Sequence, residues 1–202
     1  MSSCHMNTKE LSLAAWSWYD FNWLHRHYHN WGHATTVAEN VQKILNNRAP
    51  DVLVLAAWWH DAVYVPGAGS DANERCSAAA LGMTADHGNY EGDISAIDEA
   101  KKLIIGTAVE NHLSPVFIGG DQGILLDADL GSLADPYDLF LEHQTSIILE
   151  QGGNPETDGQ LSADFLSKFL TRRDFIYHTG YGRETWEDAA RANINRYILD
   201  NK

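Results

Sequence analysis

Residues 51–64 read DVLVLAAWWHDAVY, an apolar run that leads directly into a histidine and an aspartate. Every position from Val52 to Trp59 is apolar, which is typical of an element that is buried on all sides. A short buried strand would look similar, but the length of the run and its Ala-Ala pair favour a helix. Because a buried carboxylate and imidazole are costly unless they are paired or coordinated, His60 and Asp61 are expected either to hydrogen-bond each other or to bind a ligand.

The sequence on both sides of this run also predicts helices. Val37, Val41 and Leu45 form an apolar stripe at helical spacing. Residues 66–70, PGAGS, break the chain, and Asp71 is the expected N-cap of the next helix. Helices are predicted over residues 11–24, 34–45, 51–64, 71–83, from about 93, and over 124–132, 136–150, 161–171 and 184–200, with a loop at 113–123. The pattern predicts an all-α fold, with one helical domain over residues 11–202 after an N-terminal tail over residues 1–10.

The composition excludes several classes of partner. The chain has 202 residues, with 14 Lys and Arg against 28 Asp and Glu, and its net charge of −14 disfavours nucleic-acid polymers and anionic membrane surfaces. Two cysteines are too few for a disulfide framework, and the first residues do not resemble a signal peptide, so we expect a cytoplasmic protein. Met6 is an alternative start, which would make residues 1–5 foreign to the natural chain. Trp16 and Trp23 put aromatic rings on more than one face of the first helix, which either packs deeply or contacts a second subunit in a homodimer.

Histidines and carboxylates occur in an order that suits a metal ion. His29 and His33 lie four residues apart and would share a helix face, although a solvated helix entry explains them equally well. In LLDADL, residues 125–130, two carboxylates lie inside an apolar helix, where one of them could be a cap. These segments and His60-Asp61 would together supply two imidazoles and two carboxylates. A metal ion bound by them would have a mixed set of nitrogen and oxygen ligands. Such a set suits one divalent Mn, Fe, Co, Ni, Zn or Mg ion in the core of the bundle.

The order of these residues resembles that of a known family. The motifs are RHYHN-x-x-H at 26–33, AAWWHDAVY at 56–64, NE-x-x-SA at 73–78, LDADL at 126–130 and AR-x-NI at 190–194. Together they are similar to the HD superfamily of metal-dependent phosphohydrolases, which are all-helical, and to a bacterial subfamily known only as predicted phosphohydrolases. The resemblance extends from about Trp16 to Ile198. It implies that the metal ligands are His33, His60, Asp61 and Asp129, with Asp127 as a cap or a neighbour of the ligands.

The resemblance implies hydrolysis of a phosphate ester in a small molecule such as a nucleotide, by water that a bound metal activates. The candidates for proton transfer are His29, Asp71 and Glu74. The candidates for binding the phosphate are Arg26 and Arg75. Arg75 follows Glu74 at a place where the subfamily usually has a second carboxylate.

Two other functions stay open at this stage. Some HD-type proteins bind two irons and act as oxygenases, which requires further histidines between the His-Asp pair and the last aspartate. His87 and His112 lie in that interval and are the candidates for a second metal. Glu110 stands where the phosphohydrolase subfamily usually has a histidine, and His112 follows two residues later. The other alternative is a non-catalytic module that carries a metal and senses a nucleotide.

Overall fold

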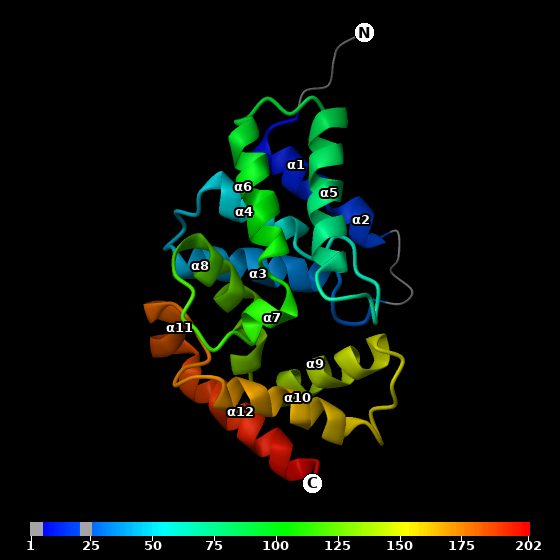
Figure 1. The fold of residues 1–202 in the computed structure, drawn as a ribbon, viewed down its shortest axis with the longest axis vertical. Helices are drawn as coiled ribbons and strands as arrows, with labels where there is room; N and C mark the ends of the chain where they lie inside the picture. The colour runs from blue at the N-terminus through cyan, green and yellow to red at the C-terminus, as the bar shows by residue number, and fades with distance from the viewer. Residues whose placement is uncertain (1–5, 21–25) are drawn as a thin grey trace.

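The computed structural model describes residues 6–20 and 26–202, and within these ranges it contains helices and no β-strand (Figure 1). The helices are α1 (Thr8–Ala14), α2 (Trp16–Asp20), α3 (Trp31–Ile44), α4 (Asp51–Trp59), α5 (Ala72–His87), α6 (Ile94–Ile105), α7 (Val109–His112), α8 (Gly120–Asp129), the 3-10 helix η2 (Leu130–Ala134), α9 (Tyr137–Glu150), α10 (Gly159–Thr171), α11 (Gly180–Thr185) and α12 (Glu187–Asp200). The predicted all-α fold is confirmed.

The apolar run at residues 51–64 forms α4, so the prediction of a helix over a strand is confirmed. Leu53, Leu55 and Trp59 are fully buried, and α4 packs against α3 and α6. The indole N–H of Trp59 donates to the carbonyl of Leu11 in α1 over 3.1 Å. The helix ends at Trp59, earlier than predicted, so that His60 occupies the C-cap position and Asp61 lies just beyond the helix.

Buried side chains form two clusters that meet at α8 and η2. The N-terminal core draws on α1 to α6 and on α8, including Leu125 and Ala128. The C-terminal core draws on η2, α9, α10 and α12, including Leu133 of η2. Figure 1 shows α9, α10 and α12 at one end of the molecule and α1, α4, α5 and α6 toward the other, with α3 and α8 between them. Asp129, the last residue of α8, therefore lies at the junction of the two cores.

The structure corrects three details of the predicted helices. Helix α1 begins at Thr8, so the tail predicted over residues 1–10 is too long. Asp71 stands at the N-cap position of α5 but makes no capping hydrogen bond, because its carboxylate accepts from Arg75 instead. The loop predicted at 113–123 ends early, where α8 begins at its glycine pair.

The structure bears on the predicted absence of a membrane partner and on the predicted aromatic face of the first helix. No helix in the ranges 6–20 and 26–202 is long and apolar enough to cross a membrane. Trp16 is half exposed on α2, whereas Trp23 and Leu24 of the predicted first helix lie outside the described residues. The homodimer, the single domain and the cytoplasmic location stay predictions.

Asp127 in α8 ties the loop between α10 and α11 to the junction. Its carboxylate oxygens accept the backbone N–H groups of His178 over 2.7 Å and Thr179 over 2.6 Å. His178 Nδ1 accepts the N–H of Ile118 over 3.0 Å, and the guanidinium of Arg173 lies against the same ring. Burial and the charges of the nearby arginines lower the pKa of His178 to about 3, so the ring is neutral at pH 7.

Protonation of His178 should therefore destabilise the fold in acid. Folding lowers the pKa of His178 from its ordinary value of 6.5 to about 3, so the unfolded chain takes up the proton more readily and the free energy of unfolding falls as the pH drops through this interval. Between about pH 7 and pH 5, the urea midpoint of the wild type should fall more than that of His178→Asn, which keeps a neutral acceptor. Equal losses in both proteins would contradict this role of His178.

Candidate metal centre

Four side chains from separate segments converge on one point. His33 comes from the first turn of α3, His60 and Asp61 follow α4, and Asp129 ends α8. His33 Nε2 lies 2.9 Å from Asp129 Oδ1 and 3.6 Å from Asp61 Oδ2. His60 Nε2 lies 3.0 Å from Asp61 Oδ2, 3.6 Å from Asp129 Oδ1 and 3.3 Å from His33 Nε2. The four side chains are between 1% and 16% exposed, so the cluster is largely withdrawn from water.

The donor atoms and their spacing fit a metal ion. Ligand atoms that lie about 2.0–2.2 Å from a metal, at right or tetrahedral angles, are roughly 2.8–3.6 Å apart. The spacings of the two histidine nitrogens from each other and from the carboxylate oxygens lie within that range. His33, His60 and Asp61 form a buried group that could hold a metal ion, and Asp129 Oδ1 lies next to this group, 2.9 Å from His33 Nε2. Two imidazoles and two carboxylates are the donor types that divalent first-row transition metals accept.

Local hydrogen bonds aim the two imidazoles. Asn30 is the N-cap of α3, and its side chain accepts the N–H groups of Gly32 and His33, which fixes the first turn. His60 Nδ1 lies 2.8 Å from the carbonyl oxygen of Ala57. With the ring proton on Nδ1, the lone pair of Nε2 faces the cluster, which is the usual arrangement of a histidine that binds a metal.

Arg26 hydrogen-bonds the backbone on both sides of the cluster. It does not line the pocket that is described below. Its Nη1 donates to the carbonyls of His29 over 2.9 Å and Asp61 over 2.7 Å, and its Nη2 donates to the carbonyl of Ala62 over 2.9 Å. The buried guanidinium also lies over the ring of Tyr19. The structure thus gives Arg26 a positioning role where the sequence predicted a phosphate ligand.

Electrostatics keep the two carboxylates of the cluster ionised. Burial alone would raise the pKa of Asp61, but His60 and His29 outweigh it and hold that pKa well below its ordinary value. The pKa of Asp129 is also lowered against the effect of burial, by His60 and by hydrogen bonds that include one from His112. Burial lowers the pKa of His60, but Asp61 and Asp129 reverse the effect and raise it. A bound cation needs ionised carboxylates at this point.

The two aspartates of LLDADL point to different places. Asp127 gives both oxygens to the backbone of the loop before α11. Asp129 turns Oδ1 toward His33, and its Oδ2 lies 3.0 Å from Nε2 of His112 in α7. His112 Nδ1 is buried and has no hydrogen-bond partner in the described part of the chain. Asp129 therefore belongs to the cluster, and Asp127 holds the backbone around it.

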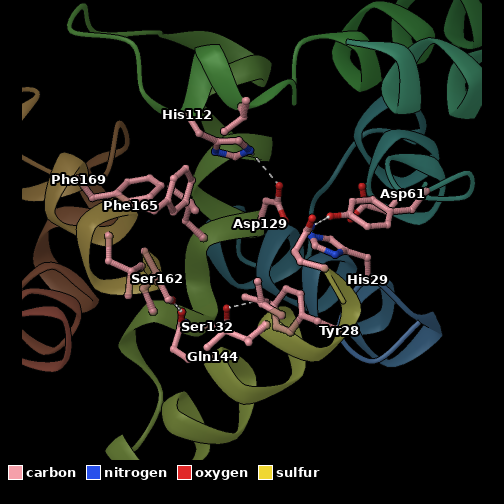
Figure 2. Close-up of a pocket in the computed structure, with 18 of the residues that line it drawn as sticks. Tyr28, His29, Asp61, His112, Asp129, Ser132, Gln144, Ser162, Phe165 and Phe169 are labelled. Carbon is pink, nitrogen blue, oxygen red and sulfur yellow. Dashed lines mark hydrogen bonds and ion pairs between the residues drawn. The ribbon is translucent and has the colours of Figure 1, made fainter. Parts of the chain in front are cut away.

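A pocket of about 650 Å³ opens from the cluster toward the C-terminal core. Figure 2 shows Asp61 and His29 on one side of this pocket and the rings of Phe165 and Phe169 on the other. Glu74 lines the pocket from α5, and its Oε2 is buried without a hydrogen-bond partner among the residues described. Burial raises the pKa of Glu74. The pocket thus joins a polar end with titratable groups to an apolar end.

Besides Arg26, three more predicted site residues do not reach this pocket. Arg75 Nη2 lies 2.6 Å from Asp71 Oδ2, and the two side chains pair at the surface. His87 is exposed near the end of α5, where its Nδ1 lies 2.8 Å from the carbonyl oxygen of Met83. The predicted roles of Asp71 in proton transfer, Arg75 in phosphate binding and His87 in a second metal site therefore have no support in the geometry.

Glu150 is the partner of His29 and is not among the site residues predicted from the sequence. Glu150 Oε2 lies 2.5 Å from His29 Nδ1, and the backbone N–H of His29 lies 3.2 Å and 3.3 Å from the two carboxylate oxygens. The carboxylate is completely buried. Glu150 is the last residue of α9, where a negative charge opposes the helix dipole. An acid in that position needs a partner, and this signal could have identified it.

Comparison with known proteins adds no assignment. No protein-family model matches this chain, and no curated protein is significantly similar to it. The resemblance to the HD superfamily therefore stays a prediction that rests on the motifs.

Metal binding should distinguish the two aspartates. Asp129→Asn should lose the metal because it removes an ionised donor. Asp127→Asn should keep the metal, while its free energy of unfolding falls by roughly 1–3 kcal/mol because the hydrogen bonds to the loop weaken. Element-resolved metal analysis and urea unfolding measure the two effects. Equal metal loss in both variants would contradict the placement of Asp129 in the cluster.

Proposed function

We propose that this chain is a metal-dependent phosphohydrolase of the HD superfamily and that it cleaves a phosphate ester in a small molecule. The observation that carries the proposal is the convergence of His33, His60, Asp61 and Asp129, of which the two aspartates line a pocket. These are the residues that the H…HD…D resemblance implies as ligands. They lie as much as 96 residues apart in the sequence, yet the Nε2 atoms of His33 and His60 lie 2.9–3.6 Å from each other and from one oxygen of each aspartate.

A divalent ion at this cluster would supply a Lewis acid that polarises a phosphoryl oxygen and lowers the pKa of water from about 16 toward about 7. The chain itself supplies the ionised oxygens of Asp61 and Asp129. The contact of His60 with the carbonyl of Ala57 fixes which ring nitrogen faces the cluster. The site is therefore held in place before a substrate arrives, which is how enzymes avoid reorganisation during the reaction.

His29 is well placed to move the proton in this reaction. Its ring lines the pocket, is held at Nδ1 by Glu150 and stacks on Tyr64 with ring centroids 4.0 Å apart. Nε2 is then left to take a proton from water as the water oxygen bonds to phosphorus. The ester P–O bond breaks, and the same proton passes to the leaving oxygen, which gives an alcohol and inorganic phosphate. Glu74 is a second candidate for this proton transfer, because its free carboxylate oxygen belongs to the same pocket.

Substitution of His29 should separate its role from metal binding. His29→Gln should retain the metal and lower kcat on 4-nitrophenyl phosphate with added Mn²⁺ by about 100-fold or more, as expected for loss of a general acid–base group. Glu150→Gln should cause a smaller loss, because it leaves the imidazole present but poorly oriented. Glu142→Gln, on the exposed side of the same helix, is the matched control and should be unchanged. Full activity of His29→Gln would remove His29 from the mechanism.

One observation favours a second function, oxygenation at a two-iron site. Each carboxylate oxygen of Asp129 lies close to a different imidazole: Oδ1 is near His33, and Oδ2 is near His112. Asp129 could therefore help to hold two ions, one beside His33 and one beside His112. His87, the other predicted ligand of a second metal, lies at the surface of α5 and leaves such a site short of donors.

The number of metal ions per chain separates the two functions. The phosphohydrolase should contain about one divalent ion, which is retained in His112→Gln. The oxygenase should contain about two irons, of which His112→Gln loses one. Element-resolved analysis of protein purified without added metal makes the measurement. Two irons in the wild type would move the oxygenase ahead of the phosphohydrolase.

A further inference from the structure

The pocket wall opposite the cluster is apolar and comes from α9 and α10. Phe169, Leu166 and Ile148 are buried along this wall. Toward the solvent, Leu161 is 70% exposed and Phe165 is 39% exposed, although both line the same pocket. Large apolar side chains that remain exposed beside a pocket are typical of a surface that binds the apolar part of a ligand.

Several polar groups near this wall are hydrogen-bonded to each other. The hydroxyl of Ser162 donates to Gln144 Oε1 over 3.1 Å. The hydroxyls of Tyr28 and Ser132 share a hydrogen bond of 2.7 Å. Figure 2 shows Gln144, Ser132 and Ser162 together along one edge of the pocket. The wall therefore offers few free hydrogen-bonding atoms for a base and a sugar.

The charge of the pocket is also unsuited to a polyphosphate. No Lys or Arg is among the described residues that line it. The acidic residues that line it are Asp61, Glu74, Asp129 and Asp158. Arg172 stacks on the ring of Phe169, but it donates to the carbonyl of Ile176 and is not a lining residue. Polyphosphates are usually bound by arginine and lysine side chains. Phosphates beyond the first would therefore lie near negatively charged carboxylates with no cationic side chain lining the pocket to offset the repulsion.

We propose that the pocket selects a phosphomonoester whose organic part is uncharged and apolar, and that it disfavours nucleotides. The inference rests on the proposed phosphohydrolase function. The phosphate group lies at the metal cluster, and the organic part lies against Phe169 and Leu166, with Leu161 and Phe165 at the opening. Water adds to phosphorus, the ester P–O bond breaks, and the products are inorganic phosphate and an apolar alcohol that receives the proton.

Relative turnover of three esters tests the selectivity. With Mn²⁺ present, kcat/KM for 2-(1-naphthyl)ethyl phosphate, an alkyl ester like AMP, should exceed that for AMP by about ten-fold or more, because its apolar ring system is buried against the wall. ATP should be the poorest of the three substrates. Turnover of AMP or ATP ahead of 2-(1-naphthyl)ethyl phosphate would overturn the inference and leave the proposed hydrolysis intact.

Binding of 1-naphthol to metal-free protein tests the apolar wall without any reaction. Calorimetry should give saturable binding, and the double variant Leu161→Ser/Phe165→Ser should raise Kd by about ten-fold. Leu199→Ser is the matched control, because Leu199 is 65% exposed on α12 and does not line the pocket. Its Kd should equal that of the wild type.

The two measurements separate the inference from the function on which it rests. If no phosphate ester is hydrolysed but 1-naphthol binds and the double variant weakens it, the apolar ligand site stands and the proposed hydrolysis fails. If 1-naphthol does not bind, or binds equally to the wild type and the double variant, the inference is overturned whatever the enzyme hydrolyses.

Discussion

The fold is organised around ionisable side chains that are withdrawn from water. His60 and Asp61 follow the apolar helix α4 and meet His33 and Asp129 at the junction of two cores. Two ionised carboxylates in such a place cost several kcal/mol each unless positive charge compensates them. Without a metal ion, protonated imidazoles compensate that charge. A bound metal ion would compensate it instead, because histidine binds a metal as the neutral imidazole. The same cost explains why so many neighbouring hydrogen bonds hold the backbone around the cluster.

The cluster lies where the two hydrophobic cores join, and both cores line the pocket beside it. Helix α8 packs in the N-terminal core and continues into η2, which packs in the C-terminal core, so Asp129 lies where the two cores join. The N-terminal side supplies His29, Asp61 and Glu74 of the pocket. The C-terminal side supplies its apolar wall and Asp158. Asp127, two residues earlier, holds the loop before α11 against α8. A ligand in the pocket would therefore contact both cores at once.

Much of this arrangement could be predicted because its signals are local. The apolar run before His60 and the two aspartates at 127–129 show charged residues in segments that must be buried. The choice of Asp129 over Asp127 needed the family resemblance, because both have the same local environment in the sequence. The contact between His29 and Glu150 joins residues 121 positions apart, and no local pattern specifies it. The hydrogen bonds of Arg26 to three carbonyls depend in the same way on tertiary packing, so its charge alone gave a misleading prediction.

Anomalous X-ray scattering from crystals of the Mn²⁺-loaded protein tests whether the four side chains bind one metal ion. One strong anomalous peak is expected about 2.0–2.3 Å from His33 Nε2, His60 Nε2 and one oxygen each of Asp61 and Asp129. A peak held by other residues would contradict this expectation. So would the absence of any peak while the four side chains remain hydrogen-bonded to each other, because the buried charges would then compensate one another without a metal.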